Sequence, residues 1–308
     1  MIYPGGRWIH RFGKGQGFEQ FAYDQINDRR LAKVIFHPDA DEIFGSVAIA
    51  DGISIVFKDS RRKEFGFEYV YSRNGINKTV VVKYPGDVLV SLNPNDGLVV
   101  DKVTKFVSQN KLQYVDQRIL PRSLFGIESE FVQLNPKKVK LLKEGYKLDL
   151  EKEIKLYAND KAGKAGRSQW YVANRSVIAK DKQFYIDQWQ VVVSSANAGG
   201  QKRDSQLAII DNHSAFGRSR VALGSFKTKK EAENFFAFCQ TALVRFMFLM
   251  TDEALTSLGK KVPDLMDYTK KNALVDFDKD LDKQLNKLVG LTDEEVEYIN
   301  SAVRPLAD

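Results

Sequence analysis

The chain has 308 residues, of which 43% are hydrophobic, and it carries a formal net charge of +7. This length and composition suit two globular domains of ordinary size. The single cysteine, Cys239, excludes an internal disulfide framework and a cysteine-based metal site, and the three histidines lie too far apart for metal-ligand spacing. No apolar run approaches the roughly 18 residues that a membrane span needs, and the N-terminus has no signal-peptide pattern, so we expect a cytoplasmic protein.

The charge is unevenly distributed along the chain. Residues 161–250 carry 14 Lys and Arg against 6 Asp and Glu, whereas residues 251–308 carry 8 against 13. A basic middle before an acidic tail favours one face that binds a polyanion, and nucleic acid is the first candidate. A second interpretation makes the chain a structural or protein-interaction domain, in which the basic middle docks against the acidic tail.

The first distinctive segment is a glycine- and arginine-rich stretch, residues 5–17. Its cations Arg7, Arg11 and Lys14 are candidates for phosphate contact, although the spacing of the glycines fits neither a Walker loop nor a dinucleotide fingerprint. A plain surface loop explains the same composition. Phosphate contact by these three side chains is therefore a hypothesis.

The segments that follow indicate part of an α/β sheet. The apolar spacing predicts a helix over residues 18–31. Short apolar runs predict strands at residues 33–37, 53–59, 67–72 and 79–84, the last two as a hairpin around Arg73, Asn74 and Gly75. An amphipathic helix over residues 98–109 then connects this part to the rest of the chain.

The C-terminal half contains the strongest helix signals. Residues 220–226 read as a strand, and Thr228 and Glu231 form a capping box. Apolar residues at steps of three and four then predict one long buried helix up to residue 250. A second capping box, Thr292 and Glu295, opens the last helix of the acidic tail.

The N-terminal segments resemble a known enzyme family. IYPGGRWIHRFGKGQGFEQF, INDRRLAKVIFHPDADEIF and ISIVF are similar to the second half of the catalytic domain of Eco57I-type, adenine-specific DNA methyltransferases of restriction-modification systems. In that family these segments follow an Asn-Pro-Pro-Tyr motif that grips the target adenine, and a glycine-rich S-adenosylmethionine site lies still earlier. This chain has neither motif. Its nearest string, residues 93–96, is predicted to be a turn that starts a helix.

The resemblance continues into the basic middle. RSLFGIESEF, residues 122–131, resembles the family's Pro-Phe-Gly-type segment, which opens the target recognition domain. Phe125, Gly126 and Phe131 match that pattern, and Leu124 stands where the family usually has proline. Residues 153–178 and 184–206 are similar to the family's recurrent strands and glycine-rich turns.

The resemblance implies a fold, a function and a set of partners. It implies an α/β partial methyltransferase sheet (1–115), an α+β target recognition domain (116–250) and a helical tail (251–308). The chain would be the C-terminal portion of an adenine-specific methyltransferase, inactive alone, with S-adenosylmethionine as the cofactor of the complete enzyme and not bound by this chain. Expected partners are double-stranded DNA and an N-terminal methyltransferase half or a restriction subunit. The alternative is a stand-alone DNA-binding specificity module without catalysis.

Methylation of adenine in a duplex requires the base to be flipped out of the stack, and a flipped base needs an aromatic surface. The resemblance assigns that stacking role to Phe57, at the end of ISIVF. A core residue of a buried strand is the other interpretation of Phe57. No catalytic residue is expected in this chain.

Sequence readout needs long polar side chains that reach base edges, because Arg and Lys bind guanine and Asn and Gln bind adenine. Three glycine-containing loops offer such side chains, and the predicted DNA-binding residues are Lys161, Lys164, Arg167, Gln169, Asn197, Gln201, Lys202, Arg203, Arg218 and Arg220. A metal-dependent nuclease pattern is also present as Asp149, Glu153 and Lys155. An amphipathic strand edge explains those three residues equally well, and we do not adopt the nuclease interpretation.

Overall fold

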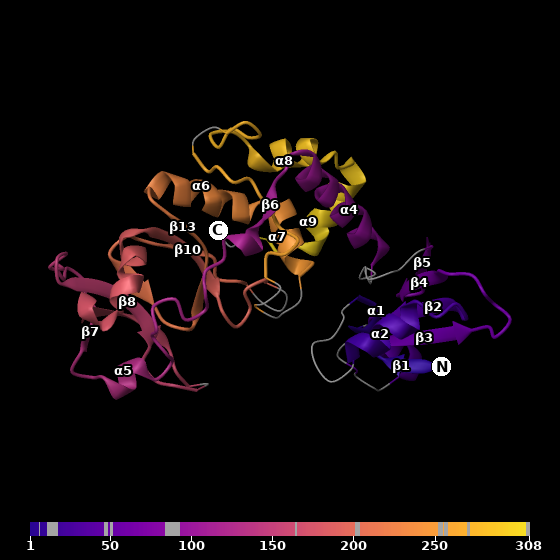
Figure 1. Cartoon of the computed structure of the whole chain (residues 1–308), viewed down its shortest axis with the longest axis horizontal. Helices are drawn as coiled ribbons and strands as arrows, with labels where there is room; N and C mark the ends of the chain where they lie inside the picture. Colours follow the sequence, from indigo (N-terminus) through magenta and orange to yellow (C-terminus); the bar gives the residue numbers. More distant parts are fainter. Residues whose placement is uncertain are drawn as a thin grey trace. The chain divides into compact units, whose positions relative to one another are not determined.

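The structure is a computed structural model that describes residues 1–5, 7–10, 18–45, 49, 52–83, 93–163, 165–200, 204–251, 255, 258–269 and 272–305, without the side chains of Pro4, Arg7, His10, Phe18 and Glu19. The chain divides into two compact units, Met1–Asp101 and Lys102–Asp308. Both units, drawn in Figure 1, mix helices with small sheets, so the fold is mixed α/β.

The first unit is built on a five-stranded sheet with the strand order β1-β3-β2-β4-β5. Strands β2 and β4 are parallel, and the other neighbouring strands are antiparallel. The elements are β1 (Ile2–Pro4), α1 (Arg7–His10), α2 (Phe18–Ile26), β2 (Leu31–His37), α3 (Asp41–Phe44), β3 (Ile53–Lys58), β4 (Phe67–Arg73), β5 (Ile76–Val82) and the start of α4 (Pro94–Gln109). The four predicted strands and the predicted helices therefore form, with bounds shifted by a few residues.

Helices α1 and α2 pack on one face of this sheet. Val34 and Phe36 alternate with outward residues along β2 and join Trp8 of α1 and Ile26 of α2 in one buried cluster. The indole Nε1 of Trp8 donates a hydrogen bond of 2.7 Å to Ser54 Oγ. This hydrogen bond satisfies the indole N–H, which would otherwise be a buried donor without a partner.

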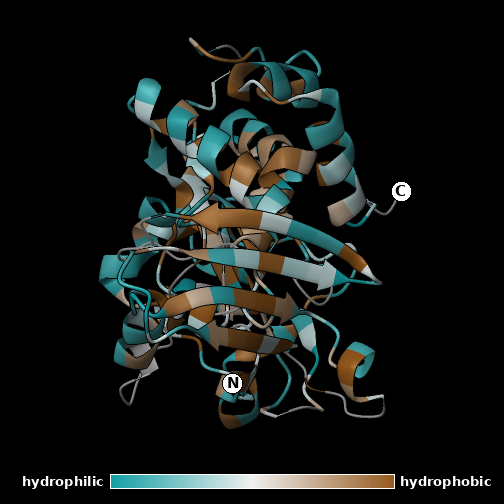
Figure 2. Cartoon of the chain, turned by 90° about the vertical axis from the view of Figure 1, so that its right-hand side faces the viewer, coloured by the Kyte–Doolittle hydropathy of each residue, from teal (hydrophilic) through white to brown (hydrophobic). Residues whose placement is uncertain are grey.

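The opposite face of the sheet carries exposed apolar side chains. In Figure 2 the strands lie in front, and no helix of the described residues crosses them. Phe57, Lys33, Glu68 and Val81 are register partners on four neighbouring strands, so they share this face. Phe57 is 48% exposed and Val81 67% exposed. The interpretation of Phe57 as a core residue is therefore wrong, whereas its stacking role stays a prediction.

Strands β4 and β5 form the predicted hairpin. Asn74 and Gly75 occupy its turn with φ angles of 52° and 73°. A two-residue turn with both central residues in the left-handed region is of type I′, whose twist matches the twist of paired strands. The local sequence was therefore sufficient to predict this turn.

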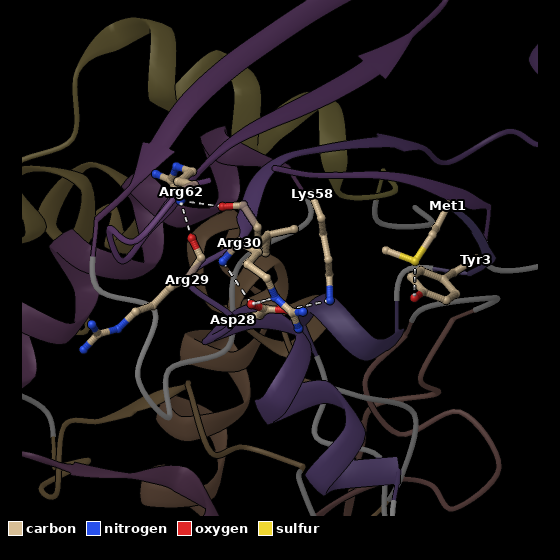
Figure 3. A network of polar contacts seen from close by, with 8 residues as sticks. Met1, Tyr3, Asp28, Arg29, Arg30, Lys58 and Arg62 are labelled. Atoms are coloured by element: carbon tan, nitrogen blue, oxygen red, sulfur yellow. Dashed lines mark hydrogen bonds and ion pairs between the residues drawn. The ribbon is translucent and has the colours of Figure 1, made fainter. Parts of the chain in front are cut away.

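Asp28 lies between α2 and β2 at the centre of an ion-pair network (Figure 3). The guanidinium of Arg30 donates to both carboxylate oxygens at 3.0 and 2.9 Å, and Lys58 of β3 donates to Oδ2 at 2.7 Å. The Asp28 side chain is 12% exposed. The hydrogen bonds from Arg30, followed by those from Lys58, hold the pKa of Asp28 well below its usual range.

We expect Asp28→Asn to lower the unfolding free energy of the first unit by about 1 kcal/mol at pH 7. A carboxylate whose folded pKa is depressed stabilises the fold above its unfolded pKa, near 4, and this contribution is lost as the pH falls. The difference from the wild type should therefore shrink between about pH 5 and pH 2. Urea unfolding at several pH values, followed by hydrogen exchange in β2 and β3, measures it.

Asp59→Asn is the matched control for this prediction. Asp59 holds Arg61 through the same backbone and guanidinium hydrogen bonds, but the pair is exposed and involves no lysine from another strand. Its replacement should leave the unfolding free energy unchanged within the error of the measurement. An equal loss of unfolding free energy in the two variants would show that the ion pair between Asp28 and Lys58 of β3 adds no stability.

Two of the sheets in the second unit share one buried cluster. Their strand orders are β12-β8-β9-β7 and β11-β10-β13, and β12 and β8 are the parallel pair. The elements after α4 are β6 (Gln113–Tyr114), α5 (Phe131–Leu134), β7 (Val139–Leu141), β8 (Glu153–Asn159), β9 (Ser168–Asn174), β10 (Trp189–Ser194), β11 (Ala208–Ile210), β12 (Ser214–Phe216), β13 (Arg220–Phe226), α6 (Lys229–Gln240), α7 (Ala242–Leu249), β14 (Pro263–Asp264), α8 (Leu281–Val289) and α9 (Asp293–Ala302). Ile154 and Leu156 of β8 pack in that cluster with Val192 of β10 and Ala222 of β13.

The long helix predicted to run up to residue 250 is broken at Thr241. Helix α6 begins at the predicted capping box of Thr228 and Glu231, but Thr241 adopts an extended ψ of 148° and separates α6 from α7. Its hydroxyl donates to the carbonyl of Phe238 at 2.8 Å. The carboxylate of Asp282 then accepts the backbone N–H of Ala242 at 2.8 Å and so caps α7. The prediction of one continuous helix is therefore wrong.

The acidic tail packs into the same compact unit through a buried ion pair. Arg118 donates to both carboxylate oxygens of Asp264 at 2.9 and 3.2 Å, and the hydroxyl of Tyr268 donates to Asp264 Oδ1 at 2.9 Å. The guanidinium of Arg118 also lies 5.2 to 5.8 Å from the ring centroids of Phe226, Phe235 and Tyr268. This cluster joins the segment after α4 to β13, α6 and the tail.

The limits of the second unit follow from these contacts. Strand β6 pairs with β14, and Lys102 Nζ lies 2.6 Å from Glu295 Oε2 of α9. Residues on both sides of position 115 and of position 250 therefore belong to one compact unit. The predicted division at these positions into a partial catalytic domain, a target recognition domain and a helical tail stays a prediction.

Candidate nucleic-acid interface

The three loops predicted to read DNA meet at the ends of their strands. They lie between β8 and β9, between β10 and β11, and between β12 and β13. Ser168 Oγ at the first loop donates to Ser219 Oγ of the third at 3.3 Å, and the backbone N–H of Ser195 in the second donates to the carbonyl of Ser219 at 2.9 Å. Ser219 thus joins all three loops.

The loops meet because the chain changes sheets between β12 and β13. Strand β12 pairs with β8, whereas β13 pairs with β10 of the other sheet. Gly217 begins this crossing, and a Cβ atom there would lie 3.3 Å from the carbonyl oxygen of Ile127 and 3.6 Å from the Cβ of Ala158. Glycine therefore permits the close approach of three segments.

Arg220, the first residue of β13, contacts strand β8 and the loop between β10 and β11. Its guanidinium lies 5.1 Å from the ring centroid of Tyr157, and Nη2 donates to the Tyr157 hydroxyl at 3.3 Å. Nη1 donates to the carbonyl of Gln206 at 2.9 Å. The ring centroids of Tyr157 and Trp170 lie 5.1 Å apart, and both rings are partly exposed. An oriented guanidinium beside aromatic rings suits contact with bases or phosphates.

A fourth segment, residues 122–128, adjoins the same loops. The backbone N–H of Arg218 donates to the carbonyl of Ile127 at 2.9 Å, and its Nη1 donates to Glu128 Oε2 at 2.7 Å. Arg122 Nη2 lies 3.4 Å from Ser195 Oγ. The hydrogen bonds from Arg218 and then from Ser123 lower the pKa of Glu128, so this carboxylate is ionised at neutral pH.

The turn between β8 and β9 has a fixed shape. Asp160 accepts the backbone N–H of Arg167 at 2.7 Å, and this contact is the main reason that the pKa of Asp160 is lowered. A Cβ atom at Gly166 would lie 2.1 Å from the carbonyl oxygen of Lys161. The glycine is therefore required for a tight turn that presents Lys161 and Arg167 to solvent.

The residues predicted to contact DNA differ in how far their side chains are exposed to solvent. Lys161, Arg167, Gln169 and Arg218 are exposed, and Arg220 is partly buried by its partners. Asn197 is only 8% exposed because it lies in the inward turn after β10, so its side chain is not on the surface in the free protein. Lys164, Gln201, Lys202, Arg203, Arg11 and Lys14 lie outside the described residues, as does the side chain of Arg7.

Three residues of this surface were not predicted as DNA contacts. Arg122 belongs to the segment quoted for its family resemblance, and a basic residue opening such a segment was the available signal. Tyr157 and Trp170 lie opposite each other on β8 and β9. Their partly outward orientation follows from the alternation of β8, in which Leu156 and Ala158 face the core.

Glu153 and Lys155 of the predicted nuclease pattern make hydrogen bonds and an ion pair within the fold. Glu153 accepts hydrogen bonds from the Tyr146 hydroxyl at 2.9 Å and from the backbone N–H of Asp149 at 3.0 Å. Lys155 is paired with Asp211, which also accepts a hydrogen bond from Ser214. Within the described ranges, no group of three His, Cys, Asp or Glu side chains is arranged to hold a metal ion.

The sequence matches no protein-family model and no curated protein. The likeness to adenine-specific methyltransferases therefore remains a prediction from the residues quoted above. In the part of the chain that the structure describes, no helix is long and apolar enough to cross a membrane.

Proposed function

We propose that the second unit recognises double-stranded DNA in a sequence-specific manner, as the target recognition part of an adenine-specific DNA methyltransferase of a restriction-modification system. The observation that carries this proposal is the meeting of three glycine-containing loops and the 122–128 segment around Ser219. Together they present Arg122, Lys161, Arg167 and Arg218 to solvent, next to the partly buried Arg220. Several cations on loops held by a rigid pair of sheets give both phosphate affinity and base-edge readout.

The ion pairs of the tail favour this proposal over a basic middle that docks the acidic tail. Asp264 and Glu295 of the tail pair with Arg118 and Lys102, which precede the basic stretch of residues 161–250. Arg218 pairs instead with Glu128, outside the tail. These ion pairs of the tail therefore do not use the loop cations Arg218 and Arg220.

The residues of this chain do not fit the family's target-adenine motif or its cofactor site. The nearest string to the missing motif begins α4, because Pro94 is its first residue and Asn93 Oδ1 accepts the backbone N–H of Asn95 at 3.1 Å. Asn93 therefore caps the start of α4, which agrees with the helix-starting turn predicted from the sequence. We therefore derive no methyl transfer from this chain, and its proposed role is recognition. A stand-alone specificity module without catalysis is the alternative.

The test is selection of duplex DNA from a random pool by the purified chain at two salt concentrations, followed by sequencing of the retained fraction. We expect one short asymmetric sequence to be enriched, with binding that weakens steeply as salt increases. Salt-sensitive binding without enrichment would contradict sequence recognition. A complete lack of binding would contradict the proposal.

Glu128 gives a prediction about affinity. It is a carboxylate among cations, and it holds Arg218 in an exposed ion pair of 2.7 Å. Glu128→Gln removes one repulsive charge and releases Arg218, so affinity for non-specific duplex should rise by about threefold. Fluorescence anisotropy with a labelled duplex measures this, with Glu144→Gln, an exposed carboxylate on the loop after β7, as the control for net charge. Equal changes in the two variants would show that Glu128 has no local role.

A further inference from the structure

A cavity of about 470 Å³ lies inside the second unit, away from the aromatic pair of the candidate interface. Val193 of β10, Leu223 of β13 and Phe248 of α7 form an apolar floor, and all three are buried. Asp204, Ser205 and Leu207, together with residues 302–305, also line the cavity. A volume in this range with a mostly apolar lining suits a small organic molecule.

Two polar side chains in the lining have unused donors. Within the described residues, the guanidinium of Arg245 makes a single hydrogen bond, to the carbonyl of Arg304, although it has five N–H groups. The amide of Gln240, the last residue of α6, makes no side-chain hydrogen bond to the described residues. Partial burial lowers the pKa of Arg245, because removing a cation from water costs free energy, and the nearby carboxylates of Asp204 and Asp282 oppose this shift.

The charges around Arg245 restrict the ligand. Asp204 lines the cavity, and Asp282 lies near the guanidinium, without a direct ion pair among the described residues. These two carboxylates repel an anionic ligand in proportion to its charge, so a monocarboxylate is repelled less than a phosphate monoester. A single carboxylate can instead accept two parallel hydrogen bonds from a guanidinium.

We propose that this cavity is a binding site for a small monocarboxylate with an apolar body, whose carboxylate pairs with Arg245 and whose apolar part covers Val193, Leu223 and Phe248. The amide of Gln240 is positioned on the same lining as a further donor. The site shares the loop between β10 and β11 with the candidate interface, since Ala198, Gly200 and Asp204 of that loop line the cavity.

Octanoate is the probe for this site, and 1-octanol is its uncharged control. We expect octanoate to raise the melting temperature of the full chain in a saturable manner and to give a single binding isotherm by calorimetry. Octanol should bind about tenfold more weakly because it lacks the charge-assisted hydrogen bonds. Equal binding of octanoate and octanol, or no binding of octanoate, would overturn the proposal.

Two variants test whether the probes bind in this cavity. Arg245→Gln should weaken octanoate binding by about tenfold or more and leave octanol binding unchanged. Leu207→Trp places a large ring in the lining of the cavity and should weaken both probes. The melting temperature of each variant without probe checks folding. Arg61→Gln, an exposed arginine of the first unit, is the control for lost charge, and an equal loss of octanoate binding in it would overturn the assignment to Arg245.

Discussion

Asp264→Ala should lower the unfolding free energy of the second unit by about 3–5 kcal/mol. Asp264 is 2% exposed and accepts hydrogen bonds from Arg118, Tyr268 and the backbone N–H of Met266. Its removal leaves the charge of Arg118 beside three aromatic rings without an anion. Denaturant unfolding followed by circular dichroism measures the change.

A control and a double replacement separate the buried ion pair from general loss of charge. Glu233→Ala breaks an exposed pair with Lys229 on α6 and should cost less than about 0.5 kcal/mol. Replacing both Arg118 and Asp264 by apolar residues, as Arg118→Met with Asp264→Leu, should restore much of the stability lost in Asp264→Ala. If the Asp264→Ala variant were as stable as Glu233→Ala, the Arg118–Asp264 ion pair would not stabilise the packing of the tail.

The combined replacement Arg218→Gln and Arg220→Gln should lower DNA affinity by about 30- to 100-fold near physiological salt. Both cations lie at the crossing between the two sheets, and Arg220 contacts both Tyr157 of β8 and the loop between β10 and β11. Loss of two phosphate contacts should also reduce the slope of log affinity against log salt by about 2. Anisotropy titrations over a range of salt concentrations measure both quantities.

The matched control for this prediction is Lys143→Gln with Lys147→Gln. These lysines are exposed on the loop between β7 and β8, outside the four segments that meet at Ser219. The control removes the same charge, so it should reduce affinity by less than about threefold. If both double variants lost affinity equally, binding would depend on overall charge and not on this surface. Melting curves of each variant show whether the loss of the Arg220 contacts affects folding.

Several elements were predictable because their determinants are local. The capping boxes of α6 and α9 form as expected, since each joins a threonine to a glutamate three residues later. The hairpin at Asn74 and Gly75 forms because these residues tolerate positive φ. Strand β8 follows its alternating pattern, with its even-numbered residues in the core.

The candidate site was only partly predictable. The glycine-containing basic loops identified Lys161, Arg167 and Arg218 as surface cations, and the structure places all three in solvent. Asn197 was indistinguishable from them in sequence, but the turn after β10 buries it. The spacing of residues along the chain carries no information about which side of an irregular loop faces the core.

The sequence by itself determined the helices, strands, caps and turns whose partners lie within a few residues. Only the tertiary structure decided the break at Thr241, where Asp282 of the tail caps α7, and the pairing of Arg118 with Asp264 across 146 residues. It also decided that the loops meet at Ser219. Local patterns report the period of a single element, whereas these contacts depend on which distant segments the shared core brings together.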